Sequence, residues 1–221
     1  MTMFSARFAR LLGAAVLVIA SGACSTLRPG TTPNPSFYAL EGAPRAATAA
    51  GPAAAPAAAL STAPTLIVNP PHAASGFDSP HIVYVREAHK LEHFAHSEWV
   101  DTPARMLAPL LVAAIEHTAA FRAVVLTPSS AAGDLRLDTE IIRLQQEFAS
   151  PPSRVRFTLR AYLVDDKTRR VLAWRNFEAV VPAASDNPYG GVVAANRAVR
   201  TVLDEVAAFC AGAARGWKHA Q

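Results

Sequence analysis

Three histidines, His89, His93 and His96, come closest in this chain to the spacing of a metal site. If this stretch were helical, the three imidazoles would lie near one face, and imidazole nitrogen is a common ligand of zinc and other transition metals. However, the stretch has no clear helix start, and no carboxylate stands in register to orient an imidazole. A solvated loop with several histidines therefore explains the pattern better than a metal site does.

Other catalytic patterns are missing from the sequence. It contains no Gly-x-Ser-x-Gly motif, no His-Glu-x-x-His motif, no glycine-rich phosphate loop and no cysteine pair spaced for zinc. Glu87, Glu92 and Glu98 are interpreted as a polar face, because nothing in the sequence places two of them around a pocket as a general acid and base. Cys210 falls on the apolar face of an expected helix and is interpreted as a small buried hydrophobic residue. We therefore predict a protein that is not an enzyme and that holds no metal or cofactor.

Cys24 carries the clearest chemical prediction. Before it lie Arg7 and Arg10, then an apolar run over residues 11–20 and a few small residues. This order is typical of an export signal, and the apolar run is too short for a membrane span, which needs about 20 residues. The segment resembles a bacterial lipoprotein signal, in which the cysteine after the cleavage site is acylated, although Ser21 stands where leucine is usual.

We predict that residues 1–23 are removed and that Cys24 is lipidated. Ser25 follows it, where aspartate would resemble an inner-membrane retention signal, so we expect the anchor in the outer membrane and the domain at its periplasmic face. The alternative is an ordinary secretory cleavage near Ala20 or Ala23, which would leave a free thiol. Cleavage before Cys24 lowers the formal net charge from +4 to +2, and no stripe of lysine and arginine is present, so we expect no nucleic-acid partner.

Residues 24–64 are expected to form a tether with one short strand-like interruption at residues 36–40. Residues 43–64 consist almost entirely of Ala, Pro, Thr, Gly and Ser, a composition that buries too little surface to fold and favours an extended or disordered chain. About 20 such residues span on the order of 60 Å in polyproline geometry. We therefore expect the domain to stand off its membrane.

Residues 65–216 are predicted to form one folded domain, followed by a tail over residues 217–221. Alternating apolar residues predict strands over residues 65–69, 81–86, 93–99, 124–126, 134–148, 154–164 and 170–181, and helical spacing predicts helices from about residue 102 to 118 and from 188 to 214. Pro109 is expected to kink the first helix or to delay its regular start, and a phase slip at residues 141–142 suggests a β-bulge. The predicted fold class is α+β, with a mixed, largely antiparallel sheet packed against two amphipathic helices.

Two surfaces are candidates for binding. One is the strand-like segment, which can add to a sheet edge of its own or a neighbouring chain and so support a homo-oligomer; its candidate residues are Phe37, Tyr38 and Leu40. The other is one face of the strand over residues 154–164, where three arginines alternate; they are Arg154, Arg156 and Arg160. These charges either keep an exposed sheet face soluble or contact lipid headgroups or an acidic partner.

Several short strings, in this order along the chain, carry a resemblance to a known family. They are residues 37–40 (Phe-Tyr-Ala-Leu), the strand leading into Pro70-Pro71, residues 82–84, Trp99, Thr102-Pro103 ahead of Met106-Leu107, and residues 134–137 (Asp-Leu-Arg-Leu). Together with the lipoprotein signal they resemble the ABC-type transport auxiliary lipoprotein family, which includes the PqiC-like components of intermembrane lipid transport. The resemblance implies a noncatalytic lipoprotein that works with an MCE-type protein and with inner-membrane ABC transporter or permease components to move lipids between membranes.

Two other functions stay open at this stage. The first is a structural envelope lipoprotein that braces the membrane or the cell wall and binds wall material. The second is a periplasmic hydrolase with a site that no known motif marks, although the missing nucleophile and metal motifs speak against it.

Overall fold

The computed structural model describes residues 34–41 and 62–217 of the 221-residue chain. Cys24 and most of the predicted tether lie outside these residues. Within the described part of the chain, nine strands form one sheet, and two helices pack against it. In chain order the elements are β1 (Ser36–Tyr38), β2 (Thr65–Val68), β3 (His72–Ala73), β4 (His81–Val85), β5 (Glu92–Trp99), α3 (Pro103–Glu116), β6 (Ala123–Leu126), β7 (Leu135–Glu147), β8 (Arg154–Asp165), β9 (Val171–Pro182) and α4 (Pro188–Gly216).

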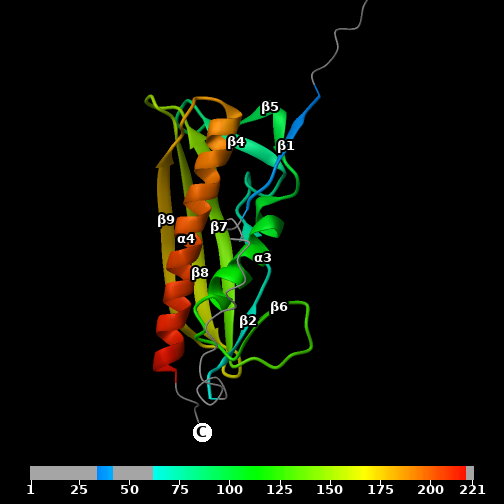
Figure 1. Cartoon of the computed structure of the whole chain (residues 1–221), viewed down its shortest axis with the longest axis vertical. Coiled ribbons are helices and arrows are strands. Elements are labelled where there is room, and N and C mark those ends of the chain that lie inside the picture. The colour runs from blue at the N-terminus through cyan, green and yellow to red at the C-terminus, as the bar shows by residue number, and fades with distance from the viewer. Residues whose placement is uncertain (1–33, 42–61, 218–221) are drawn as a thin grey trace, which may run out of the picture. The chain divides into compact units, whose positions relative to one another are not determined.

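An antiparallel meander of the three longest strands, β7, β8 and β9, forms the largest part of the sheet (Figure 1). Along β8, every second residue is buried and the residues between them face away from the core. The pairing of β7 with β8 shifts register between Ile141 and Arg143, which confirms the bulge expected at residues 141–142. The buried residues of β8 are Val155, Phe157, Leu159, Ala161 and Leu163, as the alternation predicts.

Three short parallel strands share the other edge of β7. β2 pairs with residues 135–137, β3 with residues 140–141 and β4 with residues 146–147. β6 extends the sheet beyond β2 in parallel, and β5 extends it beyond β4 in antiparallel orientation. β1 then adds to β5 in parallel and is the outermost strand on that side. The predicted fold class, α+β with a mixed sheet packed against two helices, is confirmed.

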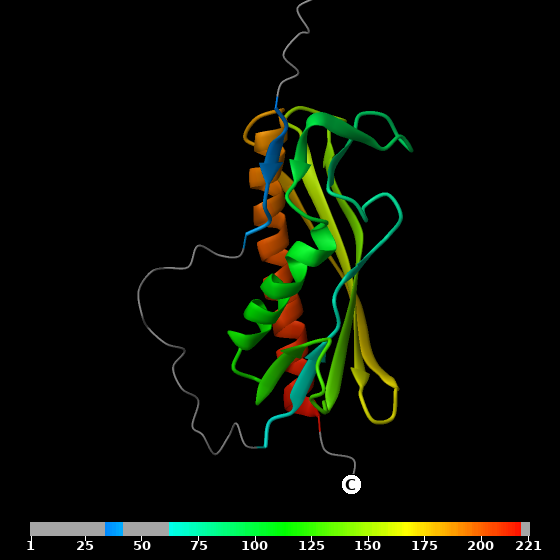
Figure 2. The same ribbon diagram turned by 90° about the vertical axis from the view of Figure 1, so that its right-hand side faces the viewer.

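Both helices lie on the same face of the sheet (Figure 2). α4 crosses β8 and β9 and presents a continuous apolar stripe to them, whereas α3 packs on α4 and on β6. The buried stripe of α4 includes Val192, Ala195, Val199, Val202, Leu203, Val206 and Cys210, as the helical spacing predicts.

Pro109 lies inside α3, which runs over its whole length without a break. The expectation that the regular helix starts only at Pro109 is therefore wrong. An interior proline costs a helix about 3 kcal/mol. However, Leu107, Leu111 and Ile115 are all completely buried on this helix, and burial of each such side chain contributes about 2 kcal/mol. Tertiary packing thus outweighs the local cost of the proline.

One predicted burial on β9 is wrong. Alternation along this strand predicts that Val171 faces the core together with Phe177 and Ala179, but Val171 is 55% exposed. The pairing of β8 with β9 shifts register between Leu163 and Val164, which changes the face that the first residues of β9 present. Phe177 and Ala179, beyond the shift, are buried as expected.

α4 begins at a crowded turn. Asn187 caps the helix, since its Oδ1 accepts a hydrogen bond from the backbone N–H of Gly190 at 2.8 Å. A Cβ atom added to Gly190 would lie 2.2 Å from the backbone oxygen of Ser185, so the preceding loop would have to shift. A Cβ atom added to Gly212, on the exposed side of the same helix, would have only Nη2 of Arg215 nearby, at 3.9 Å.

We expect Gly190→Ala to lower the free energy of unfolding by about 1–3 kcal/mol, as overpacking does. Gly212→Ala is the matched control on the same helix. It should raise the free energy of unfolding by about 0.5–1 kcal/mol, because alanine has the higher helix propensity and displaces nothing. Urea unfolding followed by circular dichroism measures both changes. Effects of the same sign at the two glycines would contradict the packing described at the start of α4.

Candidate functional site

The strand-like segment at residues 36–40 docks on its own domain. β1 pairs in parallel with β5, with Tyr38 opposite Trp99, and the carbonyl of Tyr38 accepts a hydrogen bond from the backbone N–H of Val100 at 2.8 Å. Strand addition therefore takes place within the chain in this structure. Assembly of separate chains through the same segment stays a prediction.

Asn196 of α4 holds the end of this segment. Its Nδ2 donates to the carbonyl of Ala39 at 3.2 Å, and its Oδ1 accepts a hydrogen bond from the backbone N–H of Glu41 at 2.6 Å. The same Nδ2 also donates to the carbonyl of Val192, one turn earlier on α4, at 3.0 Å. Leu40 lies between the two bonded residues, is 6% exposed and packs in the core. One helix side chain thus binds the backbone on both sides of a buried leucine.

This docking changes what the Ala/Pro-rich residues 43–64 do. Because β1 and β2 belong to the same sheet, these residues connect two points of one domain. While β1 is paired with β5, these residues therefore add no length to the tether ahead of the domain. If Cys24 carries the anchor, residues 24–35 form the link between anchor and domain, and a backbone of this length spans at most about 40 Å when extended.

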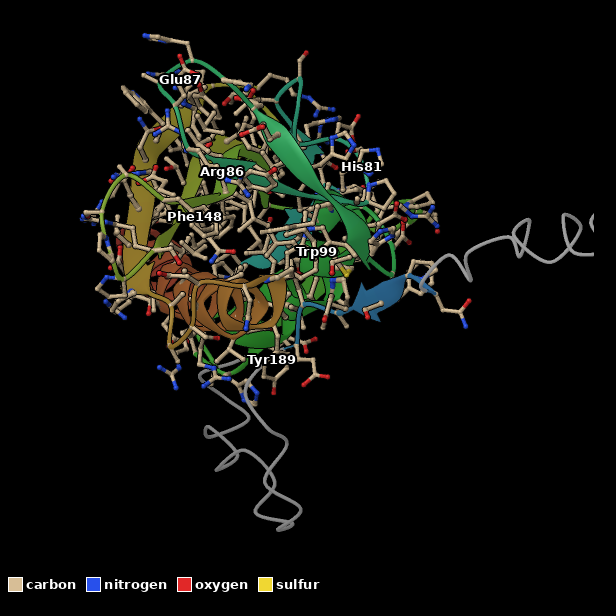
Figure 3. The ribbon with its side chains drawn as sticks, turned by 90° about the horizontal axis from the view of Figure 1, so that it is seen from above. His81, Arg86, Glu87, Trp99, Phe148 and Tyr189 are labelled. Atoms are coloured by element: carbon tan, nitrogen blue, oxygen red, sulfur yellow. The ribbon has the colours of Figure 1, made fainter. Side chains whose placement is uncertain are left out.

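A groove runs between β1 and the first half of α4; we call it the β1–α4 groove. Three large apolar side chains on it are strongly exposed, namely Phe37 at 58%, Val100 at 57% and Tyr189 at 63%. Figure 3 shows Tyr189 on the outer side of α4, whereas Trp99 points toward the interior. The groove is lined by Phe37, Tyr38, Ala39, Glu41, Val100, Tyr189, Val192, Val193, Asn196, Arg197 and Arg200.

Two arginines, Arg197 and Arg200, line the β1–α4 groove from the helix. Both are exposed, and within residues 34–41 and 62–217 neither side chain forms an ion pair. They lie three residues apart, so they project from the same side of α4 on adjacent turns. Glu41 is the one carboxylate among the lining residues, which leaves the groove with an excess of positive charge.

This groove cannot be predicted from the sequence, because its residues come from three distant parts of the chain. β1, Val100 and the first half of α4 are brought together only by the parallel pairing of β1 with β5 and by Asn196. One local signal was available. Tyr189, Arg197 and Arg200 lie off the buried stripe of α4, where a large exposed aromatic residue is unusual.

Arg156, at the centre of the predicted contact face on β8, is paired with two carboxylates. Its Nε donates to Oε1 of Glu147 at 2.8 Å, and its Nη1 donates to Oε1 of Glu178 at 2.7 Å. The hydrogen bond to Glu147 is the main cause that raises the pKa of Arg156. Burial by itself raises the pKa of Glu147, but the hydrogen bonds from Arg156 and Gln145, with the charges of Arg156 and Arg143, lower it below its usual value.

The other two predicted contact arginines differ from each other. Nε of Arg160 donates to Oδ1 of Asn176 at 3.0 Å, and its Nη1 lies 3.7 Å from Oε2 of Glu140. Nη2 of Arg154 donates to the hydroxyl of Ser150 at 2.9 Å, and Arg154 forms no ion pair in the described part of the chain. At Arg156 and Arg160 a partner would have to compete with carboxylates of the domain itself, whereas Arg154 offers a charge without an ion pair. Their role in partner contact stays a prediction.

The three histidines do not share a helix face, because residues 92–99 form β5. His93 and His96 lie on this strand, and His89 lies in the preceding turn with a φ of 69°. The ring of His93 stacks on that of His81 of β4, with centroids 4.5 Å apart. Among the residues that the structure describes, no group of three or more His, Cys, Asp or Glu side chains is arranged to hold a metal ion.

Cys210 lies in the buried stripe of α4. Burial raises the pKa of its thiol to about 12. The thiol is therefore protonated at neutral pH and is not a nucleophile, in line with the small buried hydrophobic residue expected from the sequence.

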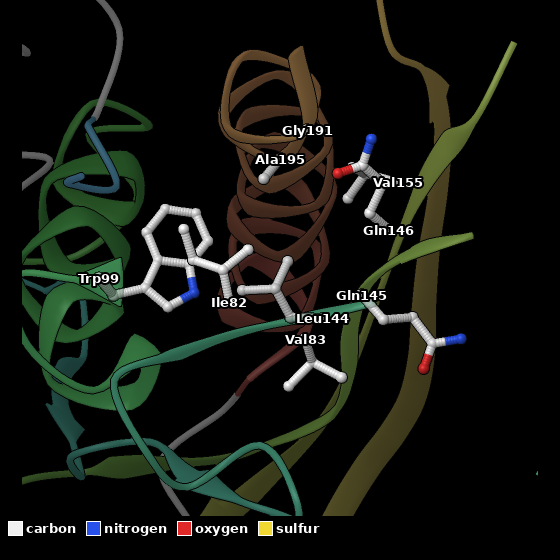
Figure 4. Close-up of a pocket in the computed structure, with 9 residues that line it drawn as sticks. All are labelled: Ile82, Val83, Trp99, Leu144, Gln145, Gln146, Val155, Gly191 and Ala195. Carbon is white, nitrogen blue, oxygen red and sulfur yellow. The ribbon is translucent and has the colours of Figure 1, made fainter. Parts of the chain in front are cut away.

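A small cavity lies between β4, β7 and α4 (Figure 4). Gln146 reaches into this region from β7 and is 2% exposed; its Nε2 donates to the hydroxyl of Ser153 at 2.8 Å, and its Oε1 has no hydrogen-bond partner among the described residues. The cavity admits about one water-sized sphere, which suits a bridging water and is too small for a lipid chain. The β1–α4 groove on the surface offers more room for a ligand than this cavity does.

A family model described as the ABC-type transport auxiliary lipoprotein component matches residues 46–207. The chain belongs to this family. The match spans most of the sequence and confirms the resemblance drawn from the short strings. The family is one of auxiliary transport lipoproteins and is not a known enzyme family. No curated protein matches the sequence.

Two solved structures are similar to this auxiliary lipoprotein in fold. A Xanthomonas campestris protein of the DUF330 family is 22% identical with a TM-score of 0.67, and the match covers 82% of this chain and 98% of that one. A second protein, titled only as uncharacterized, is 13% identical with a TM-score of 0.60, and the match covers 80% and 99%. At these identities the similarity supports the fold alone. In the described part of the lipoprotein, no helix is long and apolar enough to cross a membrane.

The pairing on β8 predicts a dependence of stability on pH. The pKa of Glu147 is lower in the folded state than in the unfolded one. Its ionised carboxylate therefore stabilises the folded state at pH values above its unfolded pKa, and this stabilisation is lost as the pH falls through the lowered folded pKa. Glu147→Gln should lower the free energy of unfolding at pH 7 by about 1 kcal/mol. The difference from the wild type should shrink below a pH of about 4.5.

Urea unfolding between pH 7 and pH 3.5 measures this difference. Glu205→Gln, at an exposed position of α4 without an ion pair in the described residues, is the control and should change little. A destabilisation by Glu147→Gln that is the same at every pH would contradict the pairing.

Proposed function

We propose that this chain is a noncatalytic auxiliary lipoprotein of an ABC/MCE-type system that moves lipids between the membranes of a bacterial envelope. The observation that carries the proposal is the family match over residues 46–207, whose description gives the role of auxiliary component in ABC-type transport. Lipid as the cargo, an MCE-type protein as the partner, and inner-membrane permease or transporter subunits as further partners are our extension of that description.

The anchor is part of the proposal. Cys24 carries the lipid, and residues 24–35 link it to the domain at the periplasmic face of the outer membrane. The support is the order of basic, apolar and small residues before Cys24, together with Ser25 in place of an aspartate. A cysteine with more than one acyl chain holds firmly to a bilayer, whereas a single chain gives only marginal binding.

The domain acts by binding and not by catalysis. In the described residues, the thiol of Cys210 is buried and protonated, no group of three or more His, Cys, Asp or Glu side chains is arranged to hold a metal ion, and the small cavity has room for about one water molecule. The surfaces that offer specific chemistry are the β1–α4 groove and the arginine face of β8. We assign the arginine face, above all Arg154, to the contact with an acidic surface of the protein partner.

Purification of the full chain from native membranes in mild detergent tests the proposal. We expect an MCE-type protein and ABC transporter or permease subunits to elute with it. Arg154→Glu should lower the yield of these partners by about tenfold, because it places a negative charge where the partner presents one; a loss of about 1.4 kcal/mol is tenfold in affinity. Lys167→Glu, an equal reversal in the exposed turn between β8 and β9, is the control and should elute as the wild type does.

Two outcomes would overturn the proposal. Elution with cell-wall material and no transporter subunit would favour a structural lipoprotein that braces the envelope. Equal loss of partners in Arg154→Glu and Lys167→Glu would mean that net charge, and not the face of β8, decides the contact.

A further inference from the structure

The β1–α4 groove combines exposed apolar side chains with unpaired positive charge. Phe37, Val100 and Tyr189 stand on the rim of one groove while remaining more than half exposed, although a chain gains free energy by burying such side chains. Clusters of this kind on a folded surface mark places where something else binds. Arg197 and Arg200 line the same groove and have no carboxylate partner in the described chain.

The length of chain before β1 limits what this surface can meet. Twelve residues, 25–36, lie between Cys24 and Phe37, and the chain from one to the other spans at most about 45 Å. Since β1 forms one wall of the groove, the groove lies closer to the anchor, along the chain, than any other described surface. An acylated Cys24 therefore keeps the groove within reach of the bilayer that holds it.

We infer that the β1–α4 groove docks on the anionic phospholipid surface of the membrane that carries the anchor. The inference rests on the anchoring part of the proposed function. Aromatic side chains such as Phe37 and Tyr189 suit the boundary between headgroups and acyl chains, and each arginine near an anionic surface contributes several-fold to binding. Glu41 is the one carboxylate among the lining residues, and the two arginines leave the charge balance of the groove positive.

Docking has a mechanical consequence for the domain. A lipid anchor alone leaves a tethered domain free to rotate, whereas an anchor and a second contact together fix its orientation. α4 would then lie with the half that carries Arg197 at the bilayer. The arginine face of β8 lies on the sheet face opposite the helices and stays available to a protein partner.

Vesicle sedimentation tests the inference on the secreted chain, residues 24–221, with Cys24→Ser to remove the anchor. Vesicles of about 30% phosphatidylglycerol in phosphatidylcholine should bind it, and vesicles of phosphatidylcholine alone should bind it at least about tenfold more weakly. Binding should fall when salt is raised from 50 to 500 mM, because charges near the surface are screened. Arg197→Gln with Arg200→Gln should weaken binding to the anionic vesicles by on the order of tenfold.

The control carries the same change of charge at the other end of the same helix and in the β8–β9 turn. Arg170→Gln with Arg215→Gln removes two exposed arginines, and Arg215 lies about 27 Å along the helix axis from Arg197. This variant should bind as the parent does. Tyr189→Ser, which removes an exposed ring and leaves the charge unchanged, should weaken binding several-fold. Circular dichroism of each variant establishes that it is folded.

Three results would overturn the inference. They are equal binding to neutral and anionic vesicles, equal loss in the groove and control variants, and self-association in light scattering that the groove variants abolish while vesicle binding is absent. The intact mass of wild-type chain extracted from membranes separates this inference from the proposed anchor. If Cys24 is acylated but the Cys24→Ser chain does not bind vesicles, the docking is wrong and the anchor stands. If the Cys24→Ser chain binds vesicles but Cys24 is unmodified, the anchor is wrong and the docking stands.

Discussion

Burial of every second residue along β8, and along β7 up to its bulge, is the constraint on which the rest of the structure depends. A slip of one residue in the pairing would expose Phe157 and Leu159 and would turn Arg156 toward the core. A guanidinium buried without a partner costs several kcal/mol, so the register is strongly fixed. The same alternation aligns charged side chains of three strands on the outer face, where Arg156 meets Glu147 and Glu178. The ion pairs are thus a consequence of the apolar pattern, and they stabilise the same strand register.

The meander determines where α4 packs, and α4 in turn holds the first described segment of the domain, residues 36–41. Asn196 can bind Ala39 and Glu41 only because the buried stripe of α4 sets the rotation of the helix about its axis. β1 then becomes an outer strand of the sheet and one wall of a surface groove. A segment that the sequence presents as part of a tether is therefore structural. The groove therefore exists only while β1 is paired with β5.

Features with a local signal could be predicted from the sequence, and features that depend on distant neighbours could not. The alternation of β8, the bulge near Ile141 and the apolar stripe of α4 are visible in short windows, and each is confirmed. The pairing of β1 joins residues about sixty positions apart, and the groove adds residues from α4, so no window contains either. Arg156 shows why the ion pairs of a charged residue are hard to predict from the sequence. Its strand position could be predicted, but its two carboxylate partners lie 9 and 22 residues away and depend on strand register.

A disulfide across β1 and β5 tests whether β1 docks on its own domain. Ser36 and Ser97 are register partners on adjacent strands, whose spacing suits a disulfide. Ser36→Cys with Ser97→Cys, in a chain that also carries Cys24→Ser, should oxidise to a bridged monomer with both new thiols consumed, while each single variant keeps its thiol. A monomer band on a non-reducing gel with the bridge found by peptide mass supports the account. Covalent dimers, or new thiols at positions 36 and 97 that stay free after oxidation, would contradict it.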